Sequence, residues 1–232
     1  MVPIGNTPML PISNIAVKSK FFVSTLTMPP QPPQPPRERI LAAADELFRR
    51  VGIRGVGVEA IAAAADTNKM TLYRHFESKD ALIAEWVRGI IAQKEQSWDE
   101  IMAAHPGDPA AQLVEWSRRT AATLAELEDR GSPIHNALAE LPEPDHPARR
   151  VIDEYRQREH KRILALCREA GFAEPELMAD QFYFLLEGAR SCVQCIGLKR
   201  VGQHLMRLVD VMVGTNHAAP IARSQGRKRP GS

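Results

Sequence analysis

The stretch Arg37–Ala81, RERILAAADELFRRVGIRGVGVEAIAAAADTNKMTLYRHFESKDA, decides the fold of this 232-residue chain. Its first apolar residues recur every three or four positions, and this spacing predicts a helix over about residues 37–51. The stripe consists of Ile40, Leu41, Ala44, Leu47, Phe48 and Val51. We expect Gly52 and Gly55 to end this helix through backbone conformations that a side chain resists.

A second and a third helix follow in the same stretch. Val58 to about Ala65 is predicted to be a short helix with Gly57 at its N-cap. Asp66 tolerates a left-handed backbone better than most residues, and Asn68 is a good N-cap for a helix from Lys69 to about His75. The two short helices are therefore expected to meet across three turn residues.

The remainder of the chain also has helical periodicity. Ser78 is predicted to cap a helix of about seven turns that Pro106 and Gly107 stop. Further helices are predicted from Pro109 to near Gly131 and over about residues 133–140, 147–170, 175–198 and 200–213. From Arg37 onward no alternating apolar pattern typical of a strand persists, so the predicted fold class is all-α.

The composition points to a globular protein away from membranes. Hydrophobic residues make up 44% of the chain and charged residues 25%, which is an ordinary globular balance. No apolar run approaches the roughly 20 residues that cross a bilayer, and three cysteines do not make a disulfide framework. We therefore expect a cytoplasmic protein with no membrane partner.

The two ends of the chain differ from its body. The net charge is +2 over residues 1–36, +1 over 37–80, −5 over 81–214 and +4 over 215–232. Nine of the eighteen prolines lie in residues 1–36, and the run MPPQPPQPP at Met28–Pro36 is typical of a polyproline linker. We expect residues 1–36 to be disordered, with Met28 as an alternative start. The basic tail is expected to be disordered too, with a phosphate-binding arm as the alternative.

The stretch 37–81 resembles the N-terminal DNA-binding region of TetR-family transcriptional regulators. The most specific part is TLYRHF at Thr71–Phe76 followed by SKDAL at Ser78–Leu82, together with Ile40-Leu41-Ala43 and Leu47-Phe48 in the first helix. A second, less specific resemblance joins residues 132–149 to one branch of the family's C-terminal domains, and it names no ligand.

The resemblance implies an N-terminal three-helix helix-turn-helix domain, joined by a long helix to a C-terminal helical domain for ligand binding and dimerisation. The expected domains are a Pro-rich segment at 1–36, the DNA-binding domain at 37–81, the regulatory and dimerisation domain at 82–214 and the basic tail at 215–232. The implied partners are a double-stranded DNA operator, a second copy of the chain through about residues 175–213, and a small-molecule effector.

The helix-turn-helix itself suits DNA, because a short helix held by a tight turn fits a major groove about 12 Å wide. Its leading end points toward base edges, and its positive dipole suits phosphate oxygens. The expected DNA-contacting residues are Asn68, Lys69, Met70, Thr71, Tyr73, Arg74, His75 and Lys79.

Several of these positions have a second interpretation. Leu72 and Phe76 are expected to be core residues that anchor the helix. Tyr73 contacts phosphate or packs as a half-buried ring, and its basic neighbour favours phosphate. Arg74 contacts DNA or forms a surface ion pair with Glu77 or Asp80. Met70 stands where the family usually has a small residue and Asp66 where it usually has Gly, which raises the alternative of a helical adaptor that has lost operator binding.

The effector site is predicted from aromatic and apolar residues of the C-terminal helices. The expected ligand-binding residues are Trp116, His135, Asn136, Tyr155, Phe182 and Cys192, and together with Met178 and Phe184 they indicate an apolar or aromatic effector with few charges. His135, Asn136 and Glu140 also fit capping and surface roles. The family reading implies repression relieved by this effector, with activation as the alternative.

Catalytic and metal chemistry are not indicated. The histidines and carboxylates do not converge on one motif, and His146 fits a helix cap before Pro147. Cys192 and Cys195 lie in a predicted helix without a preceding strand, so small-residue packing is favoured over a redox or metal site. Gly188, Ala189 and Ser191 in that helix suit a dimer face. We expect no enzyme activity, no cofactor and no metal site.

Overall fold

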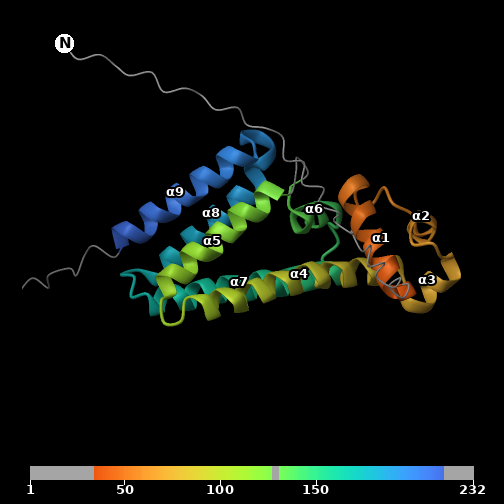
Figure 1. The fold of residues 1–232 in the computed structure, drawn as a ribbon, viewed down its shortest axis with the longest axis horizontal. Helices are drawn as coiled ribbons and strands as arrows, with labels where there is room; N and C mark the ends of the chain where they lie inside the picture. Colours follow the sequence, from red (N-terminus) through yellow and green to blue (C-terminus); the bar gives the residue numbers. More distant parts are fainter. Residues whose placement is uncertain (1–33, 127–130, 217–232) are drawn as a thin grey trace, which may run out of the picture. The chain divides into compact units, whose positions relative to one another are not determined.

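The computed structural model describes residues 34–126 and 131–216, and this part of the chain contains nine helices and no strand. Figure 1 shows them in chain order: α1 (Pro36–Val51), α2 (Val58–Ala64), α3 (Lys69–His75), α4 (Lys79–Ala104), α5 (Pro109–Glu126), α6 (Pro133–Glu140), α7 (Pro147–Glu169), α8 (Pro175–Ile196) and α9 (Leu198–Asn216). The all-α prediction is confirmed for these residues. The predictions for residues 1–33, including Met28, and for the tail beyond residue 216 lie outside them.

The helix bounds follow the predicted ones closely, with two differences. The last helix begins at Leu198 instead of residue 200 and continues to Asn216. Gly197 adopts φ of +85°, so one glycine ends α8 and lets α9 start at the next residue. The helix predicted to reach Gly131 is seen as far as Glu126, and residues 127–130 lie outside the described ranges.

The predicted caps of the helix-turn-helix are present. The Asn68 side chain accepts a hydrogen bond from the Thr71 backbone N–H at 2.8 Å, and Ser78 Oγ accepts one from Ala81 N–H at 3.0 Å. Asp66 has φ of +49° and is the only described non-glycine residue with a positive φ. These contacts fix the start of α3 and of α4.

Gly52 and Gly55 are both predicted to end α1 through backbone conformations that a side chain resists, and this is confirmed for Gly52 only. Gly52 has φ of +92°, as predicted, and a Cβ there would lie 3.0 Å from the Glu140 carboxylate. Gly55 is not left-handed. A Cβ on Gly55 would instead lie 3.0 Å from a methyl group of Val51 and 3.2 Å from its carbonyl oxygen, so lack of space favours glycine there.

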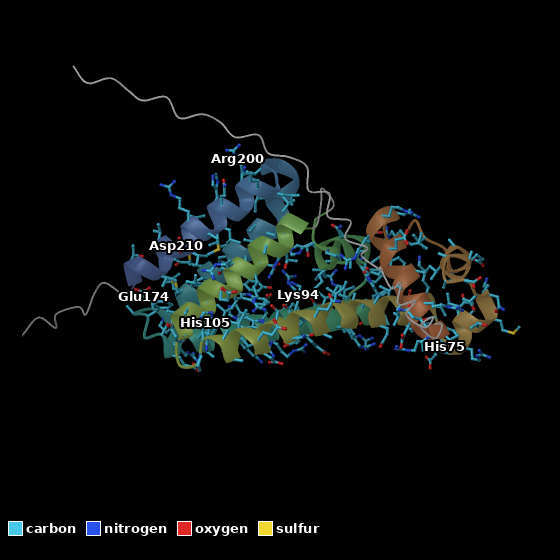
Figure 2. The ribbon with its side chains drawn as sticks, in the orientation of Figure 1. His75, Lys94, His105, Glu174, Arg200 and Asp210 are labelled. Atoms are coloured by element: carbon cyan, nitrogen blue, oxygen red, sulfur yellow. The ribbon has the colours of Figure 1, made fainter. Side chains whose placement is uncertain are left out.

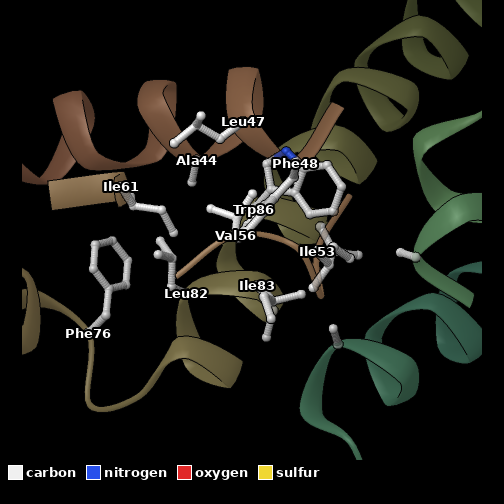
Figure 3. Close-up of a cluster of buried hydrophobic side chains, with 14 of the residues drawn as sticks. Ala44, Leu47, Phe48, Ile53, Val56, Ile61, Phe76, Leu82, Ile83 and Trp86 are labelled. Carbon is white, nitrogen blue, oxygen red and sulfur yellow. The ribbon is translucent and has the colours of Figure 1, made fainter. Parts of the chain in front are cut away.

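The first hydrophobic core is formed by α1, α2, α3 and the first half of α4. Figure 3 shows side chains from these elements meeting around Trp86 and Leu82. Leu72 of α3 is fully buried, as predicted for the anchor of that helix, and Phe76 is buried beside it. The Phe48 and Trp86 rings pack edge to face with centroids 5.2 Å apart, which fixes α1 on α4.

The same core continues into α6 and the start of α7. Its further members are Ile134, Ala137, Leu141, Ala148, Ile152 and Tyr155. Polar contacts follow this junction: Glu140 accepts a hydrogen bond from the Arg54 backbone N–H at 2.8 Å, and His146 Nε2 lies 3.3 Å from Asp80. His146 also caps α7 by accepting from Ala148 N–H at 3.1 Å, as predicted. The helix-turn-helix is therefore packed directly against α6 and α7.

A second core lies among the far half of α4 and helices α5, α7, α8 and α9. The Trp98 ring of α4 stacks on the Trp116 ring of α5 with centroids 4.2 Å apart. Phe182 of α8 is buried at the centre of this cluster. Contacts join α4 to α7 and α5, α7 to α8, and α9 to both α5 and α8. Helix α4 thus belongs to both cores, which links the helix-turn-helix to the remaining helices.

The shared core predicts cooperative unfolding. Ile152 is fully buried and belongs to the core that includes α1–α4, so Ile152→Ala should lower the free energy of unfolding by about 2–5 kcal/mol. Met102→Ala, at a position of α4 that is 37% exposed and belongs to neither core, should lower it by less, about 1 kcal/mol or below. Urea unfolding followed by circular dichroism checks both. Two separate transitions, with only the second one shifted, would contradict the shared core.

Candidate nucleic-acid interface and ligand cavity

Helix α3 presents a row of exposed side chains away from the core. Met70 is 83% exposed and Tyr73 is 42% exposed, although both belong to residue types that are usually buried. Arg74 is exposed as well, and among the described residues it has no ion pair with Glu77 or Asp80. The ion-pair alternative for Arg74 is therefore not seen, and its guanidinium is available to an outside partner.

The first residue of α3 is held by its neighbours. Lys69 Nζ lies 2.6 Å from Glu59 Oε1 of α2, and the same ammonium lies 5.9 Å from the centre of the Tyr73 ring. The hydrogen bond with Glu59 raises the pKa of Lys69 and lowers the pKa of Glu59. Because this pair is exposed, it contributes little stability, and phosphate can compete with Glu59 for Lys69.

Two of the predicted DNA contacts are already partly engaged. Lys79 is half-buried, and its ammonium donates a hydrogen bond to the Ile53 carbonyl oxygen at 2.7 Å, which ties α4 to the loop after α1. His75 lies at the C-terminal end of α3 (Figure 2), and its Nε2 is buried. Met70, Tyr73 and Arg74 are thus exposed, whereas Lys79 is engaged by the Ile53 carbonyl and His75 has a buried Nε2 without a hydrogen-bond partner among the described residues.

Two residues that are not among the predicted DNA contacts hold the turn before α3 and the start of α3. Arg39 of α1 donates a hydrogen bond from Nη2 to the Asp66 carbonyl oxygen at 3.1 Å, and Glu59 balances Lys69. Arg39 belongs to the quoted motif, yet its role depends on the distance between α1 and the turn. Periodicity does not give that distance.

The predicted ligand residues are spread over several places. Asn136 lines a cavity of about 440 Å³ between α1 and α6. Trp116 lines a cavity of about 280 Å³ between α4, α5 and α6, while His135 and Tyr155 border a small space of about 10 Å³ next to it. Phe182 is a core residue and Cys192 is half-buried on α8. The structure therefore does not gather the six residues into one site.

The 280 Å³ cavity combines an apolar wall with basic groups. Its lining consists of Arg49, Ile90, Gln93, Lys94, Ser97, Trp116, Arg119, Thr120, Thr123, Leu124, Ser132, Pro133, Ile134 and Arg190. Figure 2 places Lys94 between α4 and α5. Burial, together with the charge of Arg190, lowers the pKa of Lys94 to about 8. Among the described residues Lys94 has no carboxylate within ion-pair distance.

A network of buried charges lies beside this cavity. Glu159 of α7 is 1% exposed, and it accepts hydrogen bonds from Arg190 Nη2 at 2.9 Å and from the Tyr155 hydroxyl at 3.2 Å. Glu187 of α8 accepts from Arg156 at 2.8 Å and from Arg190 at 2.5 Å, and its Oε2 lies 3.1 Å from His135 Nε2. Burial acts to raise the pKa of Glu187, but its basic partners outweigh burial and lower it to about 2. The network joins α6, α7 and α8.

Comparison with known proteins identifies the family. Residues 40–86 match the family described as bacterial regulatory proteins, tetR family, which covers the helix-turn-helix and the start of α4. In this region the chain belongs to the TetR family. An uncharacterized HTH-type transcriptional regulator of Mycobacterium tuberculosis is 42% identical over 50 residues, which are 22% of this chain and 25% of the relative. The match therefore spans about a quarter of that curated relative.

Solved structures extend the TetR likeness beyond the helix-turn-helix. A TetR-family regulator from Streptomyces coelicolor has a TM-score of 0.73 at 25% identity, covering 78% of this chain and 95% of its own. A putative TetR regulator from Streptomyces avermitilis has a TM-score of 0.66 at 26% identity, covering 79% and 99%. AibR, solved with isovaleryl coenzyme A and operator DNA, shares the fold at 16% identity and a TM-score of 0.59, covering 75% and 97%. The two Streptomyces proteins are described as TetR transcriptional regulators, which is the class that the sequence predicts for this chain.

In this TetR-family chain α8 and α9 carry exposed apolar side chains. Phe184 is 72% exposed, and Gly188, Ser191 and Cys195 follow it along the same exposed stripe of α8. Leu177 and Ile196 of α8 and Leu208 and Val211 of α9 are exposed as well. Helices α8 and α9 therefore each leave apolar side chains exposed to solvent.

Metal and membrane features can be stated for the described ranges. No group of three or more His, Cys, Asp or Glu side chains there is arranged to hold a metal ion. Within residues 34–126 and 131–216, no helix is both long and apolar enough to cross a bilayer. Cys167, Cys192 and Cys195 form no disulfide with one another.

The turn of the helix-turn-helix gives a stability prediction. Asp66 adopts a left-handed backbone that costs an ordinary residue about 1–2 kcal/mol, so Asp66→Gly should raise the free energy of unfolding by about 0.5–1 kcal/mol. Asp66→Asn removes the charge but keeps a side chain that tolerates this conformation, so it should change stability little. Thermal unfolding checks the pair. Equal stabilisation by both variants would show that charge, and not the backbone, is the cause.

Proposed function

We propose that this chain is a sequence-specific DNA-binding transcriptional regulator that acts as a homodimer on a pseudo-palindromic operator and is released by a small-molecule effector. The observation that carries the proposal is the exposed row Met70, Tyr73 and Arg74 on a helix whose opposite face, Leu72, is fully buried. A helix held this firmly presents its outer side chains in fixed positions, as groove recognition requires. Because operator DNA is the partner, we place the protein in the cytoplasm.

The exposed residues of α3 suit two different roles, contact with phosphates and contact with bases. Arg74 and Tyr73 carry polar groups suited to phosphate oxygens, which position the helix without reading sequence. Met70 is apolar and exposed near the leading end, so it suits contact with a thymine methyl group. Lys69 and Thr71 lie on either side of it, and the Asn68 side-chain oxygen is committed to the cap. Lys79 acts chiefly by tying the start of α4 to the loop after α1.

Dimerisation follows from the exposed apolar stripe of α8 and its neighbours on α9. One recognition helix reads only a few base pairs, so two copies are needed to select a site, with half-sites about 34 Å apart or a multiple of this. The small residues Gly188 and Ser191 allow a second helix to approach α8 closely. We propose α8 and α9 as the dimer interface of this chain.

Ligand response is supported by the position of α6. Its first turn, Ser132–Ile134, lines the 280 Å³ cavity, while its last residue, Glu140, holds the Arg54 backbone of the helix-turn-helix. A ligand that displaces α6 or tilts α4 would shift the spacing of the two recognition helices. AibR, which shares the fold, was solved with an acyl coenzyme A and DNA together. A coupling of about 1–3 kcal/mol would weaken operator affinity roughly 5- to 150-fold.

Phosphate and base contacts predict different mutant behaviour on an operator selected from a random DNA library. Arg74→Ala should weaken binding to every DNA sequence and reduce the salt slope of log affinity by about one unit. Met70→Ala should leave the salt slope unchanged and relax the preference at one base pair by about 1 kcal/mol. Titration of both variants at several salt concentrations measures the two effects. If the wild-type chain selects no operator from the library, the result would favour the alternative hypothesis, a helical adaptor that has lost operator binding. That hypothesis is based on Asp66 and Met70, which depart from the usual residues of the family.

The dimer interface predicts a change of oligomeric state. Phe184→Glu places a charge at the most exposed aromatic residue of α8 and should convert the dimer to a monomer at micromolar concentration. Met102→Glu introduces the same charge at an exposed apolar position of α4 and serves as the matched control. Light scattering of the two variants gives the result. A dimer that survives Phe184→Glu unchanged would rule out α8 as the interface.

A further inference from the structure

The buried charges between α4, α7 and α8 do not balance. Three cations, Lys94, Arg156 and Arg190, surround two carboxylates, Glu159 and Glu187. Both carboxylates are already occupied, Glu159 by Arg190 and Tyr155, and Glu187 by Arg156, Arg190 and His135. Glu159 and Glu187 act on Lys94 from a distance and favour its charged form, but among the described residues no carboxylate lies within ion-pair distance of its ammonium. These three cations therefore face only two carboxylates.

Lys94 lines both the 280 Å³ cavity and the small space that contains these carboxylates. Four basic side chains contribute to the cavity wall, Arg49, Lys94, Arg119 and Arg190, and no Asp or Glu of the described residues does so. Arg190 and Arg119 are paired with carboxylates outside the wall. Arg49 is paired with Asp45 in the same way. Lys94 is therefore the cation of this wall that an anionic occupant can pair with.

The rest of the wall is suited to an apolar body. Ile90, Leu124 and Ile134 contribute aliphatic surface, and the Trp116 ring lies with its centre 6.0 Å from Lys94 Nζ. Trp116 is 3% exposed, and its indole N–H has no acceptor among the described residues. Ser97, Thr120 and Thr123 supply hydroxyl groups. A buried donor without an acceptor is costly, so an oxygen-bearing occupant would satisfy it.

We propose that the effector is a small carboxylate with a compact apolar or aromatic body, whose carboxylate pairs with Lys94 while its body packs against Trp116 and Ile90. This inference rests on the proposed function and names the chemical class of its effector. It makes the expectation of an apolar or aromatic effector with few charges more specific, because it adds one negative charge and names the residue that pairs with it. The volume of the cavity limits the occupant to small molecules.

Binding should depend on pH in one direction. Lys94 has a pKa of about 8, so the free protein loses this positive charge as pH rises through 8, while the carboxylate stays ionised. The other charged or titratable groups that line the two adjoining spaces are Arg49 of α1, Arg119 of α5, His135 of α6, Tyr155, Arg156 and Glu159 of α7, and Glu187 and Arg190 of α8. Glu187 stays ionised between pH 7 and 9, because its basic partners hold its pKa at about 2.

The experiment uses the full chain and four probes, benzoate, phenylacetate, butyrate and hexanoate, each compared with its neutral amide. Calorimetry measures binding to the wild type, to Lys94→Met, which keeps the length but loses the charge, and to Lys161→Met as the matched control on the exposed face of α7. We expect at least one acid to bind, its amide to bind roughly tenfold or more weakly, and Lys94→Met to lose the difference. Lysine side-chain NMR should show the pKa of Lys94 rising when the acid binds.

The outcomes separate this inference from the function. If none of the four acids binds at millimolar concentration, or if Lys94→Met binds them as the wild type does, the inference is overturned, while operator binding of the ligand-free protein remains unaffected. If an acid binds through Lys94 and its affinity falls above pH 8 in the wild type only, the inference stands. Failure of the ligand-free protein to bind any operator would contradict the proposed function and leave the Lys94 result unchanged.

Discussion

The burial of α4 in two hydrophobic cores is the constraint on which the rest of the structure depends. Its first half packs with α1–α3 around Trp86 and Leu82, and its second half packs with α5 and α7 around Trp98. Helix α6 and the start of α7 close the first core from the other side through Ile134 and Ile152. The helix-turn-helix is therefore not joined to the other helices by a flexible linker. Because α4 is packed into both cores, a movement of α4 changes the packing of both.

The ion pair of Glu159 and Arg190 is buried, so its desolvation has a free-energy cost that other contacts must offset. Removing two charges from water is unfavourable unless geometry and further hydrogen bonds compensate, and here Tyr155, Glu187 and Arg156 provide them. The pair is weak evidence for stability, but it fixes α7 and α8 in one register. It also keeps polar groups in a part of the protein where a purely apolar interior would have closed the cavity.

Local features were predictable from the sequence, whereas features that join distant segments were not. The caps at Asn68 and Ser78 and the left-handed Asp66 depend on neighbouring residues, so the printed stretch was enough to predict them. The bond from Lys79 to Ile53 depends on how α4 meets the loop after α1, and this packing is invisible to periodicity. One sequence pattern does indicate Lys94. The apolar pairs of α4 recur at 82/83, 86/87 and 90/91, and at the next position of this repeat the pair is Lys94 and Glu95, which places charged residues on the inward face of the helix.

The stacked pair of Trp98 and Trp116 has an optical consequence. Two indoles with centroids 4.2 Å apart share their excitation, and one of them forms part of the cavity wall with the Lys94 ammonium nearby. The third tryptophan, Trp86, lies in the other core, where it donates a hydrogen bond to Asp45. The chain therefore contains its own fluorophores for both cores, and emission from the stacked pair reports on the cavity without any attached label.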